Sequence, residues 1–120
     1  MPAKTILIVD DEPSVSKSLE LVLEDQYSLL FASSAEAGFE QLRTHPEINL
    51  ILLDIRLPGM DGITALTQIR KIRADVPIAI VTAGRSDEVH NQAEILGVDD
   101  YILKPFEIDD LLKRVALLIS

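Results

Sequence analysis

Three acidic side chains follow directly after short aliphatic runs of this sequence. Asp10 and Asp11 come after the run Ile6–Val9, and Asp54 comes after Leu50–Leu53. A single aspartate after a strand is usually a turn former. Carboxylates gathered in one place repel each other, by about 1 kcal/mol per pair at 4 Å in water and by about 4 kcal/mol at an effective dielectric of 20. If these three side chains meet, a cation must offset that repulsion.

Two other apolar runs also end in polar residues. Thr82 follows the run Ile78–Val81, and Lys104 follows Tyr101–Leu103. The Lys104 ammonium can neutralise one carboxylate, and a hard dication with oxygen ligands suits the others. The looped ligand spacing of a calcium site is absent, so the acidic set favours Mg²⁺.

A carboxylate beside Mg²⁺, an ammonium and a hydroxyl is suited to nucleophilic attack on phosphorus. The cations stabilise the charge of the transferring group, and the hydroxyl binds one of its oxygens. Asp54 is the predicted nucleophile because it ends the central run, whereas the adjacent pair Asp10 and Asp11 is better placed to hold the metal. The predicted product is an aspartyl phosphate.

The pattern of apolar residues predicts the strands and helices that must position these side chains. Most of the runs are continuously apolar, which is typical of parallel strands covered by helices on both faces. Five strands are predicted: Ile6–Val9, Leu29–Ala32, Leu50–Leu53, Ile78–Val81 and Tyr101–Leu103.

Each run is followed by a segment with helical spacing of its apolar residues. Pro13 lies in the first turn of the first segment, Ser33 with Glu36 predicts a capping box for the second, and Ser86 can cap the fourth. The strongest apolar stripe belongs to the last segment: Ile108, Leu111, Leu112, Val115, Leu118 and Ile119.

The alternation of strands and helices predicts an α/β fold of five βα units. Five strands are too few for the usual eight-stranded parallel barrel, so right-handed crossovers favour an open, doubly wound sheet. Ligands of such sheets bind outside the carboxyl ends of the strands. That edge is where the polar residues described above would meet.

Composition limits the classes of function. The chain has 120 residues, no cysteine and a formal net charge of −9, which predicts one domain over residues 1–120 without disulfides. The negative charge disfavours direct binding to nucleic acid or to anionic lipid. No apolar run has the length of a membrane span or a signal peptide, so a soluble, cytoplasmic protein is expected.

Four motifs carry a resemblance to a known family. They are ILIVDDEP at 6–13, LLDIRLPGMDG at 52–62, VTAG at 81–84 and YILKPF at 101–106. Occurring jointly and in this order, they make the whole chain similar to the CheY-like receiver domains of response regulators in bacterial two-component signal transduction. The resemblance implies a flavodoxin-like three-layer sandwich with the parallel strand order 2-1-3-4-5.

The resemblance also implies roles for individual residues. Asp54 would be the phosphoacceptor, and Mg²⁺ would be bound by Asp10 or Asp11, Asp54 and the backbone carbonyl of Arg56. Lys104 would bridge to the phosphoryl group or to Asp54.

Further roles follow from the same resemblance. Thr82 would bind a phosphoryl oxygen, and its movement would let Tyr101 swing from an exposed to a buried position. The Lys104–Pro105 peptide would be cis.

A phosphorylation switch is therefore expected rather than a metabolic enzyme, although the domain would speed its own phosphorylation and dephosphorylation with Mg²⁺. A sensor histidine kinase or phosphotransfer protein would supply the phosphoryl group. The response would appear on a surface formed by the fourth helix, fifth strand and fifth helix. A downstream effector domain or protein, or a second copy of the chain, would read that surface.

Three alternatives fit the residues less well. A haloacid-dehalogenase-like phosphatase needs a second acid two residues after its nucleophile, where this chain has Arg56. A flavodoxin-like redox module needs a Ser-, Thr- or Gly-rich phosphate loop where DDEP stands. A degenerate receiver commonly lacks one of the acids or the lysine, and none is missing. His45 and His90 are interpreted as surface residues.

Overall fold

The computed structural model describes residues 3–57, 59–83 and 87–119. Its strands are β1 (Thr5–Val9), β2 (Ser28–Ala32), β3 (Ile48–Leu53), β4 (Ile78–Thr82) and β5 (Asp100–Leu103). Its helices are α1 (Pro13–Leu23), α2 (Ala35–Thr44), α3 (Gly62–Ile72), α4 (Asp87–Ile95) and α5 (Ile108–Ile119). All five predicted strands are confirmed.

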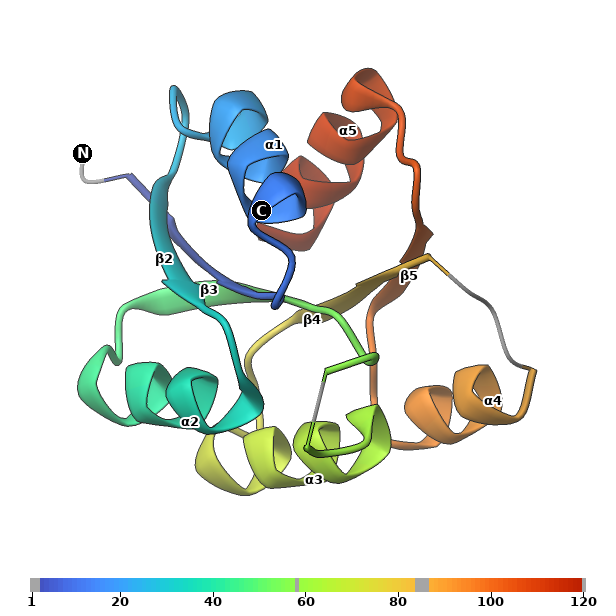
Figure 1. The fold of residues 1–120 in the computed structure, drawn as a ribbon. Helices are drawn as coiled ribbons and strands as arrows, with labels where there is room; N and C mark the ends of the chain where they lie inside the picture. The colour runs from blue at the N-terminus through green and yellow to red at the C-terminus, as the bar shows by residue number, and fades with distance from the viewer. Residues whose placement is uncertain (1–2, 58, 84–86, 120) are drawn as a thin grey trace.

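The five strands form one parallel sheet in the order β2-β1-β3-β4-β5. Helices α1 and α5 cover one face, and α2, α3 and α4 cover the other (Figure 1). This three-layer arrangement confirms the predicted doubly wound fold and strand order. It also explains the continuous apolar runs, because the side chains of β1, β3 and β4, apart from the partly exposed Asn49, are buried whichever face they point to.

The core lies on both faces of the sheet. Leu7, Ile51 and Ile80 belong to the cluster packed under α2, α3 and α4, whereas Ile8 and Leu52 belong to the cluster under α1 and α5. Adjacent residues of one strand thus pack into the hydrophobic layers on opposite faces of the sheet. Two hydrophobic layers hold the strand ends in fixed positions, which is the precondition for a site built from several strands.

Two sequence predictions about the helices need correction. The cap of α2 is Ser34 rather than Ser33: the Ser34 Oγ accepts a hydrogen bond from the Ala37 amide at 3.1 Å. Ile108 is 55% exposed and does not join the buried stripe of α5, since it is the first helical residue. The predicted cap Ser86 lies outside the described residues.

In the described part of the chain, no helix combines the length and the apolar character needed to cross a bilayer.

Candidate functional site

Two buried aspartates stand at the carboxyl ends of neighbouring strands. Asp10 and Asp54 are 4% and 3% exposed. The strand pairing continues through them, since the Asp54 amide donates to the Val9 carbonyl at 2.9 Å and the Asp10 amide donates to the Ala32 carbonyl at 3.0 Å. The sheet therefore positions both carboxylates as extensions of β1 and β3.

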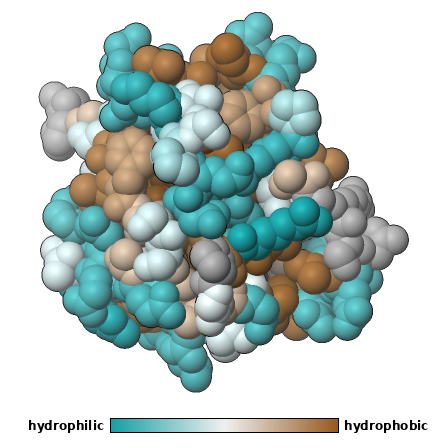
Figure 2. Space-filling model, viewed as in Figure 1, coloured by the Kyte–Doolittle hydropathy of each residue, from teal (hydrophilic) through white to brown (hydrophobic). Residues whose placement is uncertain are grey.

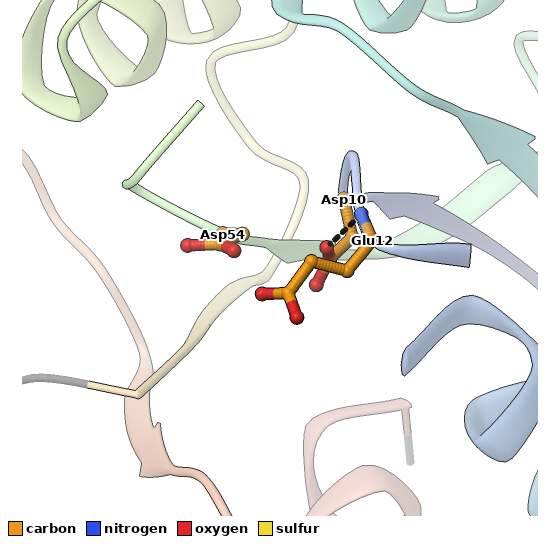
Figure 3. A group of neighbouring side chains, drawn as sticks. All are labelled: Asp10, Glu12 and Asp54. Carbon is orange, nitrogen blue, oxygen red and sulfur yellow. Dashed lines mark hydrogen bonds between the residues drawn. The ribbon is translucent and has the colours of Figure 1, made fainter. Parts of the chain in front are cut away.

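Glu12 joins these two aspartates. Carboxylate oxygens of Asp10, Glu12 and Asp54 all lie within 4.8 Å of one another, and Figure 3 shows the three side chains converging from the ends of β1 and β3. The Glu12 amide also donates to Asp10 Oδ1 at 2.9 Å. Glu12 was not among the residues predicted from the sequence, although it is the third acid of the DDEP run.

Asp11 was also predicted as a metal ligand, but its side chain does not point to the same place as that of Asp10. Its side chain is exposed, and among the described residues it is not one of the three converging carboxylates. It lines a pocket together with Asp10, Phe31 and Ser33. Its role as a metal ligand remains a prediction.

Lys104 supplies the positive charge. Its Nζ lies 2.9 Å from Asp10 Oδ2, 3.3 Å from Asp54 Oδ2 and 3.7 Å from Glu12 Oε1. Burial lowers the pKa of Lys104, but the hydrogen bonds and charges of Asp10 and Asp54 outweigh it, so its pKa is raised above the ordinary 10.5. The ammonium is therefore charged at neutral pH and neutralises one of three carboxylates.

The Lys104–Pro105 peptide is cis, as the resemblance implied. The Lys104 amide donates to the Thr82 carbonyl at 2.8 Å, which continues the pairing of β4 with β5 past Leu103.

Thr82 is completely buried at the end of β4. Its Oγ1 has no hydrogen-bond partner among the residues that the structure describes. A buried hydroxyl is normally paired, because leaving it unpaired costs about 1–3 kcal/mol. This hydroxyl is available to a ligand at the same sheet edge as Lys104.

The loop after β3 fixes the Asp54 carboxylate. The Arg56 amide donates to Asp54 Oδ1 at 2.8 Å, while the Arg56 side chain is exposed. Farther along, Asp61 caps α3 by accepting from the Thr64 amide at 2.9 Å. The acceptor oxygen atoms of Asp54 are therefore oriented by its own loop and by Lys104.

Gly62 allows this loop to close against α3. A Cβ at Gly62 would lie 2.3 Å from the Ile55 Cβ and 2.6 Å from its Cα. A Cβ at Gly59 would meet no atom within 4 Å, so a side chain there is disfavoured only by the left-handed backbone, with φ +82°. We expect Gly62→Ala to lower the free energy of unfolding by about 2 kcal/mol or more through overpacking. Gly59→Ala should cost about 1 kcal/mol through backbone strain alone. Urea denaturation of both variants checks this; equal losses would contradict the steric argument.

The remaining predicted residue, Tyr101, lies on β5 and is half-buried. Its ring makes an edge-to-face contact with His90 of α4, with 4.9 Å between ring centroids.

His90 was interpreted as a surface residue, and this is wrong: its Nε2 pairs with Glu94 at 3.1 Å and its Nδ1 is buried. The i,i+4 spacing of His90 and Glu94 predicts their pairing but not the burial of the ring. His45 is half-exposed beside Glu47.

The donor set fits a hard dication. Three carboxylates balanced by one ammonium leave an excess of negative charge, and oxygen ligands are those that Mg²⁺ prefers. Hydrophilic side chains also gather across the middle of the face shown in Figure 2.

A five-stranded parallel sheet with acids after β1 and β3, a hydroxyl on the last residue of β4 and a lysine after β5 defines the receiver class of signalling domains. Residues 6–116 match the family of the response regulator receiver domain, and the chain belongs to that family.

Relatives and solved structures agree with this assignment. The chain is 37% identical over 113 residues to the transcriptional regulatory protein DltR of Streptococcus agalactiae, covering 93% of this chain and 50% of that protein. It is 38% identical over 120 residues to AruR of Pseudomonas aeruginosa, a transcriptional regulatory protein, covering 95% and 48%. The chain thus spans about half the length of these curated relatives.

Among solved structures, a CheY-like receiver domain protein from Methanospirillum hungatei superposes with a TM-score of 0.91 at 34% identity, covering 98% of this chain and 94% of that one. A CheX-CheY-BeF3-Mg complex from Borrelia burgdorferi gives 0.90 at 27% identity, covering 97% and 89%.

Proposed function

We propose that this domain accepts a phosphoryl group on the Asp54 carboxylate from a sensor histidine kinase or a phosphotransfer protein. The bond from the Asp54 oxygen to phosphorus forms as the bond from phosphorus to the donor imidazole nitrogen breaks, and the departing imidazole keeps the electron pair and takes up a proton. The observation that carries the proposal is the joint contact of Lys104 with Asp10 and Asp54. It is supported by the Thr82 hydroxyl at the end of β4, which has no hydrogen-bond partner among the described residues.

Each residue has a distinct part in this reaction. The Arg56 amide orients the Asp54 carboxylate, Lys104 binds a phosphoryl oxygen, and the Thr82 hydroxyl donates to another. Mg²⁺, held by Asp54 with Asp10, Asp11 or Glu12 and by the Arg56 carbonyl, would neutralise charge on the transferring group. The same groups would support self-phosphorylation by small donors and hydrolysis of the product.

The added charge operates a switch. When Thr82 turns toward the phosphoryl group, the space beside β4 changes and Tyr101 moves inward, altering the surface of α4, β5 and α5. A downstream effector domain or protein would read this surface, consistent with relatives that are transcriptional regulators and are about twice as long. Formation of a phosphorylation-dependent homodimer through this surface is a second form of output. With a net charge of −9, this domain itself is not expected to bind nucleic acid or a membrane.

Intact mass spectrometry tests the proposal. After incubation with acetyl phosphate and Mg²⁺, the wild type should gain the mass of one phosphoryl group, and it should gain none when EDTA replaces Mg²⁺. Asp54→Asn should gain none, because an amide oxygen cannot form the acyl phosphate. Asp75→Asn, which removes an acid whose side chain is 86% exposed, is the matched control and should be phosphorylated normally. Equal uptake by Asp54→Asn, or no uptake by the wild type, would reject the assignment.

A further inference from the structure

Helix α4 is lightly packed along most of its length. Of its described side chains only Ala93 is fully buried, and Ile95 is 84% exposed. A cavity of about 240 Å³ lies on one side of the helix, lined by His90 and Tyr101, and extends past Glu94 to Asp99 in the turn that follows the helix. A second of about 360 Å³ lies toward the loop after β3, lined in part by Gln92. Open space therefore borders the helix on both sides.

The carboxyl end of α4 is held by Arg70 of the neighbouring helix α3. The guanidinium donates from Nη2 to the Gly97 carbonyl at 2.6 Å and from Nε to the Leu96 carbonyl at 3.1 Å. It also donates from Nη1 to the Val76 carbonyl at 2.6 Å. The last carbonyls of a helix lack partners within the helix, and the planar fork of an arginine can satisfy several of them.

The turn after α4 is also fixed to the sheet. The Asp99 amide donates to the Ile78 carbonyl at 2.9 Å, and the Ile78 amide donates to Asp99 Oδ2 at 2.9 Å. Gly97 reverses the chain with φ +82°. Arg70 and the reciprocal bonds of Asp99 thus anchor the end of α4 to both α3 and β4.

The two ends of α4 lie at different distances from the phosphoacceptor. The helix follows Thr82, so its amino end begins at the sheet edge that carries the site, while its carboxyl end leads back to the start of β5 at the opposite edge. Nine residues of α-helix span about 14 Å. His90, in the amino-terminal half, is the α4 residue that contacts Tyr101 by its ring.

We propose that Arg70 makes the carboxyl end of α4 a fixed pivot. Phosphorylation of Asp54 then displaces the amino-terminal half of α4, and His90 transmits this displacement to Tyr101. The inference rests on the proposed function for its signal, but the pivot itself is a property of the unmodified domain. Arg70 acts here as a positioning residue.

Amide hydrogen exchange tests the pivot directly. In the unmodified wild type, the amides of Leu96, Gly97 and Val98, which bond to carbonyls of α4, should exchange more slowly than those in the amino-terminal half. Arg70→Gln should speed exchange at these three amides by about tenfold, since it removes charged hydrogen bonds that hold them in place. The matched control is Arg73→Gln, because Arg73 donates to the Pro46 and Ile48 carbonyls rather than to α4.

Tyrosine fluorescence is a second readout, which reports how Tyr101 responds to phosphorylation. The chain has no tryptophan and two tyrosines, so in a Tyr27→Phe background the tyrosine fluorescence comes from Tyr101. Acetyl phosphate with Mg²⁺ should change this fluorescence in the parent and in Arg73→Gln. In Arg70→Gln the change should fall by half or more, while phosphoryl uptake by mass stays equal. Arg70→Lys, which keeps one donor group without the fork, should give an intermediate change.

Two results would overturn the pivot: unchanged exchange at residues 96–98 in Arg70→Gln, or a fluorescence change in Arg70→Gln equal to that of the parent. Absence of phosphoryl uptake in the wild type would instead refute the proposed function and the signal that depends on it. The exchange comparison without acetyl phosphate would still decide whether Arg70 holds the helix end.

Discussion

Lys104→Met is expected to destabilise the metal-free domain by about 3 kcal/mol, because it leaves buried carboxylates without their counter-charge. Asp10 and Asp54 have side chains only 3% and 4% exposed, and Lys104 Nζ contacts both. Methionine keeps the approximate length and apolar stem of lysine, so the loss reports the ammonium rather than packing. Thermal and urea unfolding in EDTA give the measurement. The control is Lys17→Met, which removes an exposed ammonium paired with Glu20 and should change stability little.

The difference in stability between the wild type and Lys104→Met should depend on pH in one defined direction. The pKa of Lys104 is raised in the folded state above 10.5, so its contribution is fully present below that ordinary value. It is lost as the pH rises through the higher folded-state pKa. The gap between wild type and Lys104→Met should therefore be constant from neutral pH to about 10 and should shrink only at more alkaline pH. A gap that already shrinks between pH 7 and 9 would contradict the charged contacts described here.

Asp54→Asn should have the opposite effect on the metal-free domain and raise its stability by about 1–2 kcal/mol, since it removes one of three mutually repelling carboxylates. Asparagine can still accept from the Arg56 amide and from Lys104. For a domain of this size, 1 kcal/mol corresponds to a rise in Tm of about 4 °C. A lower Tm for the variant in EDTA would show that the attraction of Lys104 outweighs the repulsion.

Mg²⁺ should remove the higher stability of Asp54→Asn relative to the wild type. Binding to the folded state stabilises it by mass action, and the wild type offers one more carboxylate to the metal than the variant does. The Tm of the wild type should therefore rise with added Mg²⁺ more than that of Asp54→Asn. Asp75→Asn should respond like the wild type, which separates the site from general effects of ionic strength.

The fold and most of the site were predictable because both depend on periodicity and on position along the strands. Continuous runs such as Leu50–Leu53 indicate strands buried on both faces, and parallel strands bring their carboxyl ends to one edge. Asp10, Asp54 and Lys104 were found by that rule alone, and the structure brings their side chains together. Predicting that these three meet needed no knowledge of side-chain conformations, and the role of Thr82 stays a prediction.

The parts that were missed depend on local geometry that spacing does not encode. Both Ser33 and Ser34 are suitable caps, and only the backbone path after β2 selects Ser34. Glu12 reaches the site because the turn after β1 brings its side chain back over Asp10. His90 is partly buried because α4 packs against β5, a contact between residues eleven positions apart that no local pattern predicts.

The most direct test of the central claim is to find which carboxylate carries the phosphoryl group. Borohydride reduces an aspartyl phosphate to homoserine, so the domain is incubated with acetyl phosphate and Mg²⁺, reduced, digested and sequenced by mass spectrometry. The account predicts homoserine at position 54 and unmodified aspartate at positions 10 and 11. Homoserine at position 10 or 11, or aspartate at all three positions after measured phosphoryl uptake, would contradict it.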